Sequence, residues 1–328
     1  MAGCKGVQMT TSRRISVANI ERAASVIDPV FLHTPQFNSE PLSDELGCNL
    51  TLKIETMNPI RSFKGRGADF FFRENREFLA ERQVVCATAG NFGQAVAYAA
   101  SRNGVKPIVF CATNANPLKV GRMKQLGADV RQVGENFDAA KVAAKEFCAG
   151  NGAYFVEDGR DVAISEGAGS IAVELMASCA LDTVVVPLGN GALISGVATW
   201  IRHVQPAVRV VGVASEGADS MEASWRTNTV IERPSVDTIA DGIAVRTPVP
   251  EALNDMRGVV DDVVLVSEAS IHRAMRLLFS TSGIVGEPAG VAGISGLIEH
   301  DSLLRGRVAT IVCGSNLTDE QMKQWLVA

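Results

Sequence analysis

The sequence predicts an α/β protein of two domains, in which open, twisted and mostly parallel sheets are flanked by helices. Short runs rich in β-branched residues alternate with amphipathic stretches from about residue 84 onward. Several of these runs, such as Thr183–Leu188, are continuously apolar, which is typical of parallel strands covered on both faces. The 328 residues, 47% of them hydrophobic, are enough for two domains that share a cleft.

The first block of the chain alternates strand and helix patterns. Its expected strands are Val84–Thr88, Pro107–Ala112, Asp129–Val133 and Ala153–Glu157, and its expected helices are Phe92–Asn103, Pro117–Leu126 and Phe137–Ala149. Gly104 and Gly127 end the first two helices, and Pro117 stands where a helix begins. Successive units of this kind need right-handed crossovers, so we expect a parallel sheet.

The second block has expected strands at Thr183–Leu188, Arg209–Ser215, Asp261–Ser267 and Arg307–Cys313. The segment from about Met221 to Arg257 lacks clear periodicity and contains three prolines, so we expect a long functional loop region with short helices. The residues before Gly65 are expected to pack on this second block. The predicted domains are therefore 1–66 with 159–328, which form the large domain, and 67–158, which form a small inserted domain.

Composition excludes several classes of function. The formal net charge is -5 and no long basic run occurs, so no nucleic-acid partner is expected. No apolar run approaches the ~18 residues of a membrane span, and the amino terminus does not match a secretory signal. The seven cysteines, from Cys4 to Cys313, are scattered without a C-x-x-C pair, which favours reduced thiols in the cytoplasm. The four histidines form no ligand pattern, so no metal is expected.

The segment NPIRSFKGRG (58–67) is the strongest local signal of a reactive group. Lys64 stands between Phe63 and two glycines at the start of a helical pattern. A lysine amine becomes reactive when an aromatic neighbour partly removes it from water, and we expect Gly65 and Gly67 to let the backbone approach a flat ligand closely. A lysine at a helix start is, on its own, usually a solvated side chain, so this prediction depends on the segments around it.

Two glycine-containing loops each join a predicted strand to a predicted helix. TAGNFGQ (88–94) and GNGAL (189–193) place backbone N–H groups at helix N-termini, where a carboxylate or phosphate binds. Residues 167–172 fit G-x-G-x-x-A, but no acidic residue follows at the distance needed to hold a ribose, which disfavours a dinucleotide. Cys313 ends the last strand, where a thiol is either a core residue or a weak S–H partner for a ring nitrogen.

In this order and spacing, the segments resemble the fold type II (tryptophan-synthase-β-like) family of pyridoxal-phosphate enzymes, and within it the serine/threonine dehydratase and serine racemase branch. The resemblance runs from about His33 to Asn316 and includes SFKGRGA, TAGNFGQ, EGAGS, GNGAL, ADGIAV (240–245), EPAG (287–290) and VCGSN. It implies pyridoxal 5′-phosphate bound in the cleft between the domains, a small-molecule amino-acid substrate and a homodimer.

The resemblance also implies roles for individual residues. Lys64 would hold the cofactor covalently, release it to the substrate amine and then take the Cα proton. Phe63 would pack on the cofactor, Asn91 would bond its ring hydroxyl, and Cys313 would face its pyridine nitrogen. The cofactor phosphate would be held by Gly189, Asn190, Gly191, Ala192 and Leu193. The substrate would be held by Ser62, Thr88, Ala89, Gly90, Asn91 and Phe92.

The implied reaction is the elimination of water from an L-β-hydroxy amino acid of the serine, threonine or phenylserine type, which yields a 2-oxo acid and ammonia. A thiol at position 313 is a neutral partner that weakens the electron sink and so favours loss of a β-leaving group. Ala89 replaces the serine of the racemase branch, and Phe92 replaces a histidine, which favours a phenylserine-type side chain. β-Replacement of the cysteine synthase kind, racemisation and a non-enzymatic protein of this fold remain alternatives.

Overall fold

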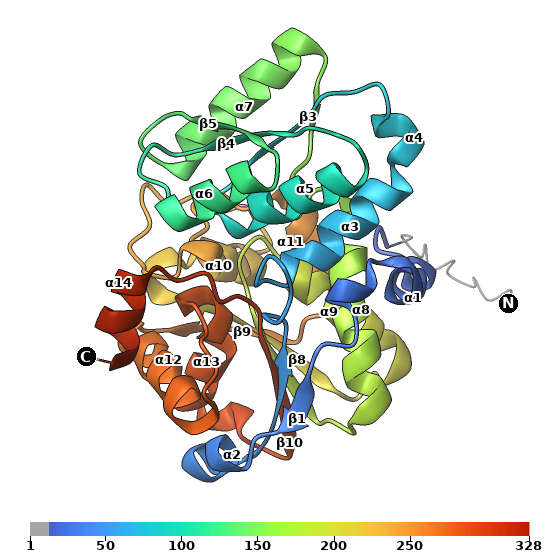
Figure 1. Cartoon of the computed structure of the whole chain (residues 1–328). Coiled ribbons are helices and arrows are strands. Elements are labelled where there is room, and N and C mark those ends of the chain that lie inside the picture. The colour runs from blue at the N-terminus through green and yellow to red at the C-terminus, as the bar shows by residue number, and fades with distance from the viewer. Residues whose placement is uncertain (1–12, 328) are drawn as a thin grey trace, which may run out of the picture.

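The computed structural model describes residues 13–327 and contains two sheets with helices around them (Figure 1). Cys4 and the rest of residues 1–12, where no secretory signal is expected, lie outside the described residues. Within residues 13–327, no helix is long and apolar enough to cross a membrane. The α/β class predicted from the alternating pattern is confirmed.

The larger sheet has six strands in the order β1-β2-β10-β7-β8-β9. The strands are β1 Gln36–Asn38, β2 Asn49–Ile54, β7 Thr183–Pro187, β8 Arg209–Ser215, β9 Asp262–Val266 and β10 Arg307–Val312. β1 runs antiparallel to β2, and the other neighbouring pairs are parallel. The four strands predicted for the second block are all present, and β1 and β2 from the amino-terminal stretch join the same sheet.

The smaller sheet has four parallel strands in the order β5-β4-β3-β6. They are β3 Val84–Ala87, β4 Ile108–Cys111, β5 Asp129–Gln132 and β6 Tyr154–Phe155. β6 is shorter than expected because the chain turns after Phe155, where the amides of Arg160 and Asp161 donate to the carbonyl of Glu157. This early turn brings Glu157 and Asp158 out of the sheet.

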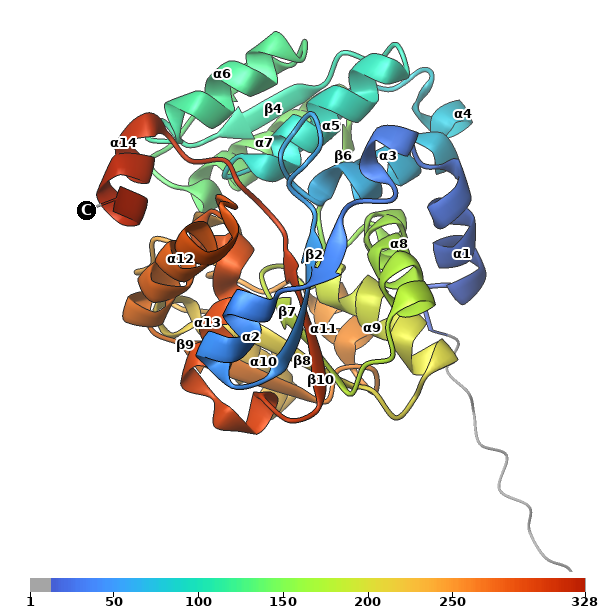
Figure 2. The same ribbon diagram turned by 60° about the horizontal axis from the view of Figure 1, so that its bottom comes forward.

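Helices cover both faces of the larger sheet, with α8 and α9 on one side and α12 and α13 on the other (Figure 2). The helices are α1 Val17–Val26, α2 Glu40–Leu46, α3 Lys64–Glu74, α4 Arg76–Leu79, α5 Asn91–Arg102, α6 Pro117–Gln125, α7 Phe137–Asn151, α8 Val162–Ser178, α9 Ala192–Val204, α10 Ser220–Thr227, α11 Pro250–Met256, α12 Glu268–Ser282, α13 Ala292–Glu299 and α14 Asp319–Met322. The aperiodic segment contains short helices as predicted, including the 3₁₀ turn η3 Asp241–Ile243.

Glycines allow α3, α8 and α9 to pack closely. A Cβ on Gly67 would lie 2.5 Å from the carbonyl oxygen of Ile164, and one on Gly196 would lie 2.0 Å from that of Ser165. A Cβ on Gly65 would lie 2.2 Å from the ring of Phe31. The expectation that Gly65 and Gly67 face a ligand is therefore wrong, since both make room for neighbouring elements. The G-x-G-x-x-A match lies inside α8, where its glycines serve the same helix packing.

Helix α3 connects the two blocks, because it packs against both α8 and α5. The expected boundary after residue 66 consequently falls within a helix. We retain two domains, 1–66 with 159–328 and 67–158, as a proposal that rests on the two separate sheets.

Candidate active site

A cavity of about 380 Å³ is lined by residues from both sheets' loops, at the carboxyl ends of β3 and β7. The site residues predicted from the sequence line it with one exception. Those that line it are Phe63, Lys64, Thr88, Ala89, Gly90, Asn91, Phe92, Gly189, Asn190, Gly191, Ala192, Leu193 and Cys313. Four segments that are distant in the sequence thus meet in one place, at the edge where parallel α/β sheets commonly bind ligands.

Ser62 is the exception and does not line the cavity. It is fully buried and forms a β-bridge with Gly314. Its amide donates to Oδ1 of Asn58 at 3.3 Å, and its Oγ accepts from the amide of Lys64 at 3.4 Å. Because the bridge fixes this backbone against the end of β10, the side chain serves the turn that leads into α3.

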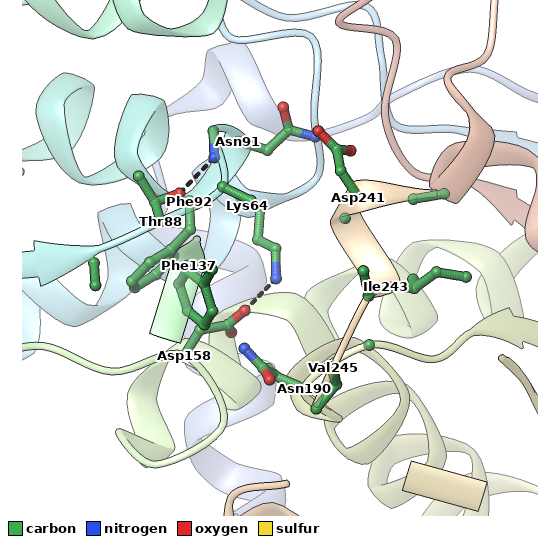
Figure 3. Close-up of a pocket in the computed structure, with 18 of the residues that line it drawn as sticks. Lys64, Thr88, Asn91, Phe92, Phe137, Asp158, Asn190, Asp241, Ile243 and Val245 are labelled. Carbon is green, nitrogen blue, oxygen red and sulfur yellow. Dashed lines mark hydrogen bonds and ion pairs between the residues drawn. The ribbon is translucent and has the colours of Figure 1, made fainter. Parts of the chain in front are cut away.

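Lys64 is the first residue of α3, and its side chain enters the cavity (Figure 3). Its Nζ pairs with a carboxylate oxygen of Asp158 and lies 4.7 Å from the centroid of the Phe63 ring. Only 14% of the Lys64 side chain is exposed, and only 7% of the Asp158 side chain. The amine is therefore held in a largely dry place between an aromatic ring and a buried carboxylate.

The segment from Gly189 to Leu193 turns from β7 into α9. Gly191 caps the helix with a φ of 89°, a value that favours glycine. Within residues 13–327, no backbone carbonyl accepts a hydrogen bond from the amides of Asn190 and Gly191, and the first amides of α9 have no partner inside the helix. These N–H groups and the helix dipole form a site for an anion such as a phosphate.

The segment from Thr88 to Phe92 forms a second such turn, from β3 into α5. Oγ1 of Thr88 accepts hydrogen bonds from the amides of Gly90 and Gly93, at 2.8 and 3.1 Å. Gly90 has a φ of 154°, and a Cβ there would lie 2.1 Å from the side chain of Lys119. The hydroxyl thus fixes the loop, and the amides at the start of α5 face the cavity as donors for a carboxylate.

Asn91 is held from two sides at the start of α5. Its Nδ2 donates to Oε1 of Glu287, and its Oδ1 accepts from Nδ2 of Asn316 at 2.9 Å. Oε2 of Glu287 accepts from the amide of Asn316 at 2.9 Å. Burial raises the pKa of Glu287, and the nearby Lys119 opposes this rise. The orientation of the Asn91 amide is therefore set by buried partners and not by solvent.

Cys313 lies at the end of β10 and is 6% exposed. Burial raises the pKa of its thiol to about 12, while the charge of Lys64 acts in the opposite direction. Its Sγ lies 3.6 Å from the carbonyl oxygen of Ala289. The thiol is consequently neutral at physiological pH, and it presents no charge to whatever ring lies beside it.

Sequence reasoning missed several charged and aromatic residues of the cavity. Asp241 and Glu287 lie within the motifs ADGIAV and EPAG, which could have identified them, but Asp158 and Phe137 carry no local signal. Further ion pairs connect segments around the cavity. These pairs are Lys119–Asp241 (2.6 Å), Lys141–Glu157 (2.5 Å) and Asp138–Arg246 (2.6 Å). Lys119–Asp241 and Asp138–Arg246 join the inserted block to the segment 241–247 of the larger block.

Among the described residues, no three His, Cys, Asp or Glu side chains are grouped so that they could hold a metal ion. Asp219, which lies just before the aperiodic segment, pairs with Arg233 at 2.6 Å. The carboxylate of Asp219 is therefore engaged in an ion pair.

Comparisons with known proteins agree with this geometry. Residues 27–314 match the family described as "Pyridoxal-phosphate dependent enzyme". The chain is 32% identical over 317 residues to the catabolic L-threonine dehydratase of Staphylococcus aureus. The aligned region covers 95% of this chain and 92% of that protein. Its fold is similar to the processed threonine deaminase isoform 2 of Solanum lycopersicum (TM-score 0.85, 27% identity, 96% and 90% of the two chains). It is also similar to maize serine racemase (TM-score 0.88, 26% identity, 94% and 96%).

Proposed function

Because the chain belongs to the family of pyridoxal-phosphate dependent enzymes, we propose that it is a dehydratase (ammonia-lyase) that removes water from an L-β-hydroxy amino acid and releases a 2-oxo acid and ammonia. The observation that carries this proposal is the placement of the Lys64 amine in one cavity with two helix N-termini, those of α5 and α9. An amine, a site for a phosphate and a site for a carboxylate are what such a reaction needs.

The residues present fit pyridoxal 5′-phosphate. The unpartnered amides around Gly191 suit a phosphate monoester, and the neutral thiol of Cys313 suits an unprotonated ring nitrogen. Phe63 offers an apolar surface beside Lys64, and Asn91 offers an amide whose orientation is fixed. When bound, the cofactor supplies the electron withdrawal that loosens the Cα proton of the amino acid.

The chain's own residues do the remaining work. The amides of Ala89, Asn91 and Phe92 would hold the substrate carboxylate, so that Cα lies toward Lys64, while those of Thr88 and Gly90 donate within the protein. Lys64 would take the Cα proton as a general base from one face. Racemisation needs a second group that returns a proton to the opposite face of Cα, and the methyl group of Ala89 cannot do so. This supports elimination over racemisation. The ion pairs Lys119–Asp241 and Asp138–Arg246 would hold the two blocks together and keep water out.

The aromatic residues that line the cavity suggest the nature of the substrate side chain. Phe92, Phe137 and Phe155 all line the cavity, and Phe92 and Phe155 are almost fully buried. This aromatic wall supports phenylserine as a candidate beside serine and threonine. A second candidate function is β-replacement or racemisation within the same family, which the likeness to maize serine racemase keeps in view.

A 2-oxo-acid assay tests the proposal. The loaded protein is given L-serine, L-threonine, phenylserine and 3-hydroxyaspartate, with both diastereomers where they exist, and no added thiol. We expect release of a 2-oxo acid and ammonia from at least one of them, and loss of the visible band and of activity in Lys64→Ala. Lys106→Ala, which removes an exposed lysine of the small block, is the matched control. Product formation only when the assay is repeated with an added thiol would favour β-replacement, and inversion without 2-oxo acid would favour a racemase.

A further inference from the structure

Asp158 is the carboxylate of the cavity that the proposed reaction leaves without an assigned task. It follows β6, and Gly159 beside it packs so closely on the glycine-rich loop that a Cβ there would lie 2.6 Å from the carbonyl oxygen of Asn190. The Asp158 residue is 6% exposed. One carboxylate oxygen, Oδ2, pairs with Nζ of Lys64, and the other, Oδ1, is buried without a hydrogen-bond partner among the described residues.

The other carboxylates of the cavity have partners that catalysis need not disturb. Asp138 pairs with Arg246, Glu157 with Lys141, and Asp241 with Lys119. Glu287 accepts hydrogen bonds from Asn91 and from the amide of Asn316. Asp158 differs from them, because the cation that balances its charge is Lys64, the residue on which the proposed reaction depends.

Lys64 cannot balance that charge throughout the proposed reaction. To act as the general base, its Nζ must be a neutral amine that is free to approach Cα. A buried carboxylate without a cation or donor is unfavourable, and it favours any ligand that supplies one. The substrate is the molecule that enters the cavity at this stage.

The donor on the substrate is not the departing hydroxyl. A β-hydroxyl leaves most easily as water, which requires that it receives a proton, whereas a carboxylate draws the hydroxyl proton toward itself. Asp158 would therefore hold back a hydroxyl that it bonded. The donor that suits Asp158 lies further along the side chain, where Phe137 and Phe155 also face the cavity and can contact either methylene groups or a cation.

Building on the proposed function, we infer that Asp158 determines side-chain specificity. Its carboxylate recognises an amino acid whose side chain carries a hydrogen-bond donor, best a cationic amine, beyond the β-carbon. A side-chain carboxylate at the same place meets Asp158 directly and is rejected. Among β-hydroxy amino acids, the inference thus favours one with a basic or hydroxylated side chain over serine, threonine and phenylserine, which have no donor beyond the β-hydroxyl.

Three amino acids of equal size test this assignment without turnover. L-2,4-diaminobutyrate, L-homoserine and L-norvaline end in an ammonium, a hydroxyl and a methyl group, and none has a leaving group on Cβ. Their dissociation constants are measured from the change in the visible absorption of the loaded enzyme. Because a hydrogen bond to a charged group is worth about a factor of 10 to 100, we expect L-2,4-diaminobutyrate to bind about 10- to 100-fold more tightly than L-norvaline, with L-homoserine between them.

Asp158→Asn keeps the shape of the side chain and removes its charge. We expect the preference for L-2,4-diaminobutyrate over L-norvaline to fall to less than about threefold, through weaker binding of the amine. Asp129→Asn, which changes a half-buried carboxylate on β5 that does not line the cavity, should keep the wild-type preference. An unchanged preference in Asp158→Asn would overturn the inference, as would wild-type protein that binds all three equally. The wild-type comparison decides alone should the variant not fold.

The binding measurements, taken together with the 2-oxo-acid assay, separate this inference from the proposed function. A loaded enzyme that prefers the amine but releases no 2-oxo acid from any β-hydroxy amino acid refutes the dehydratase proposal and supports the role of Asp158. An enzyme that releases 2-oxo acid but shows no preference refutes the role of Asp158 and supports the dehydratase proposal.

Discussion

Arg66 offers a test of how the fold holds Lys64 in place, since it lies on the first turn of α3. Its guanidinium is fully buried and donates to both oxygens of Glu55, at 2.8 and 2.9 Å, and to both oxygens of Glu174, at 2.7 and 3.0 Å. Lys53 also reaches Glu174, at 2.6 Å, but forms no ion pair with Glu55. Two cations, Arg66 and Lys53, and two carboxylates thus form a buried ion-pair network that connects β2, α3 and α8.

Replacing Arg66 by methionine leaves the buried Glu55 without a cation, while Glu174 keeps Lys53. Removal of one partner from a buried ion pair costs ~3–5 kcal/mol, so we expect Arg66→Met to lower the free energy of unfolding by about that amount. The double variant Arg66→Met/Glu55→Gln removes the unpaired charge and should recover a substantial part of the loss. Arg273→Met is the control, because Arg273 is largely exposed and its pair with Glu45 should contribute less than about 1 kcal/mol.

Urea unfolding of the four proteins at pH 7 measures these values. The dependence of the free energy of unfolding on pH, below pH 4.5, adds a second check. Burial alone would raise the pKa of Glu174, but hydrogen bonds and charges from Arg66 and Lys53 lower it to about 2, from an ordinary 4.5. Glu174 then binds fewer protons in the folded state, so its contribution is complete above pH 4.5 and is lost as the pH falls toward 2. A loss below about 1 kcal/mol in Arg66→Met, or no recovery in the double variant, would refute the reasoning.

Three further predictions concern single side chains. Ala89→Ser places a hydroxyl in the cavity that can transfer a proton where Ala89 cannot, so racemisation should become measurable by chiral chromatography; unchanged enantiomeric purity would contradict this. Burial raises the pKa of Asp255 to about 6, so the folded state binds more protons and loses stability as the pH rises from 3.8 to 6. Asp255→Asn should therefore raise the melting temperature at pH 8 but not at pH 3, and an equal effect at both would reject the assignment. Because burial raises the pKa of Cys313 to about 12, iodoacetamide at pH 8 should leave Cys313 unlabelled in the folded protein and label it in urea, as peptide mass spectrometry can show; rapid labelling of the folded protein would argue against a neutral, buried thiol.

The regular elements could be predicted from the sequence because their signals are local. Alternating strand and helix patterns located the strands of both sheets except β1 and β2, and Pro117 and Gly127 marked the ends of α6. The loops that follow β3 and β7 were expected in one site because of the family resemblance, since these two strands belong to different sheets. The cavity lining agrees with that expectation.

Long-range pairing could not be predicted in the same way. Asp158 reaches Lys64 across 94 positions and Glu287 reaches Asn91 across 196, and no local pattern encodes either contact. Gly65 and Gly67 were misread because a glycine that makes room for a neighbouring helix looks the same in sequence as one that makes room for a ligand. Ser62 was expected to bind the substrate because of its place in the lysine motif. Its β-bridge to Gly314, which keeps it out of the cavity lining, depends on the path of the chain after β10.

The attachment of the cofactor to Lys64 is the central claim and can be measured directly. The purified chain is loaded with pyridoxal 5′-phosphate, reduced with borohydride, digested and analysed by mass spectrometry. We expect the reduced cofactor on the peptide that contains Lys64, at about one per chain, and none on that peptide in Lys64→Ala. Label on another lysine, or a chain that takes up no cofactor, would contradict the account.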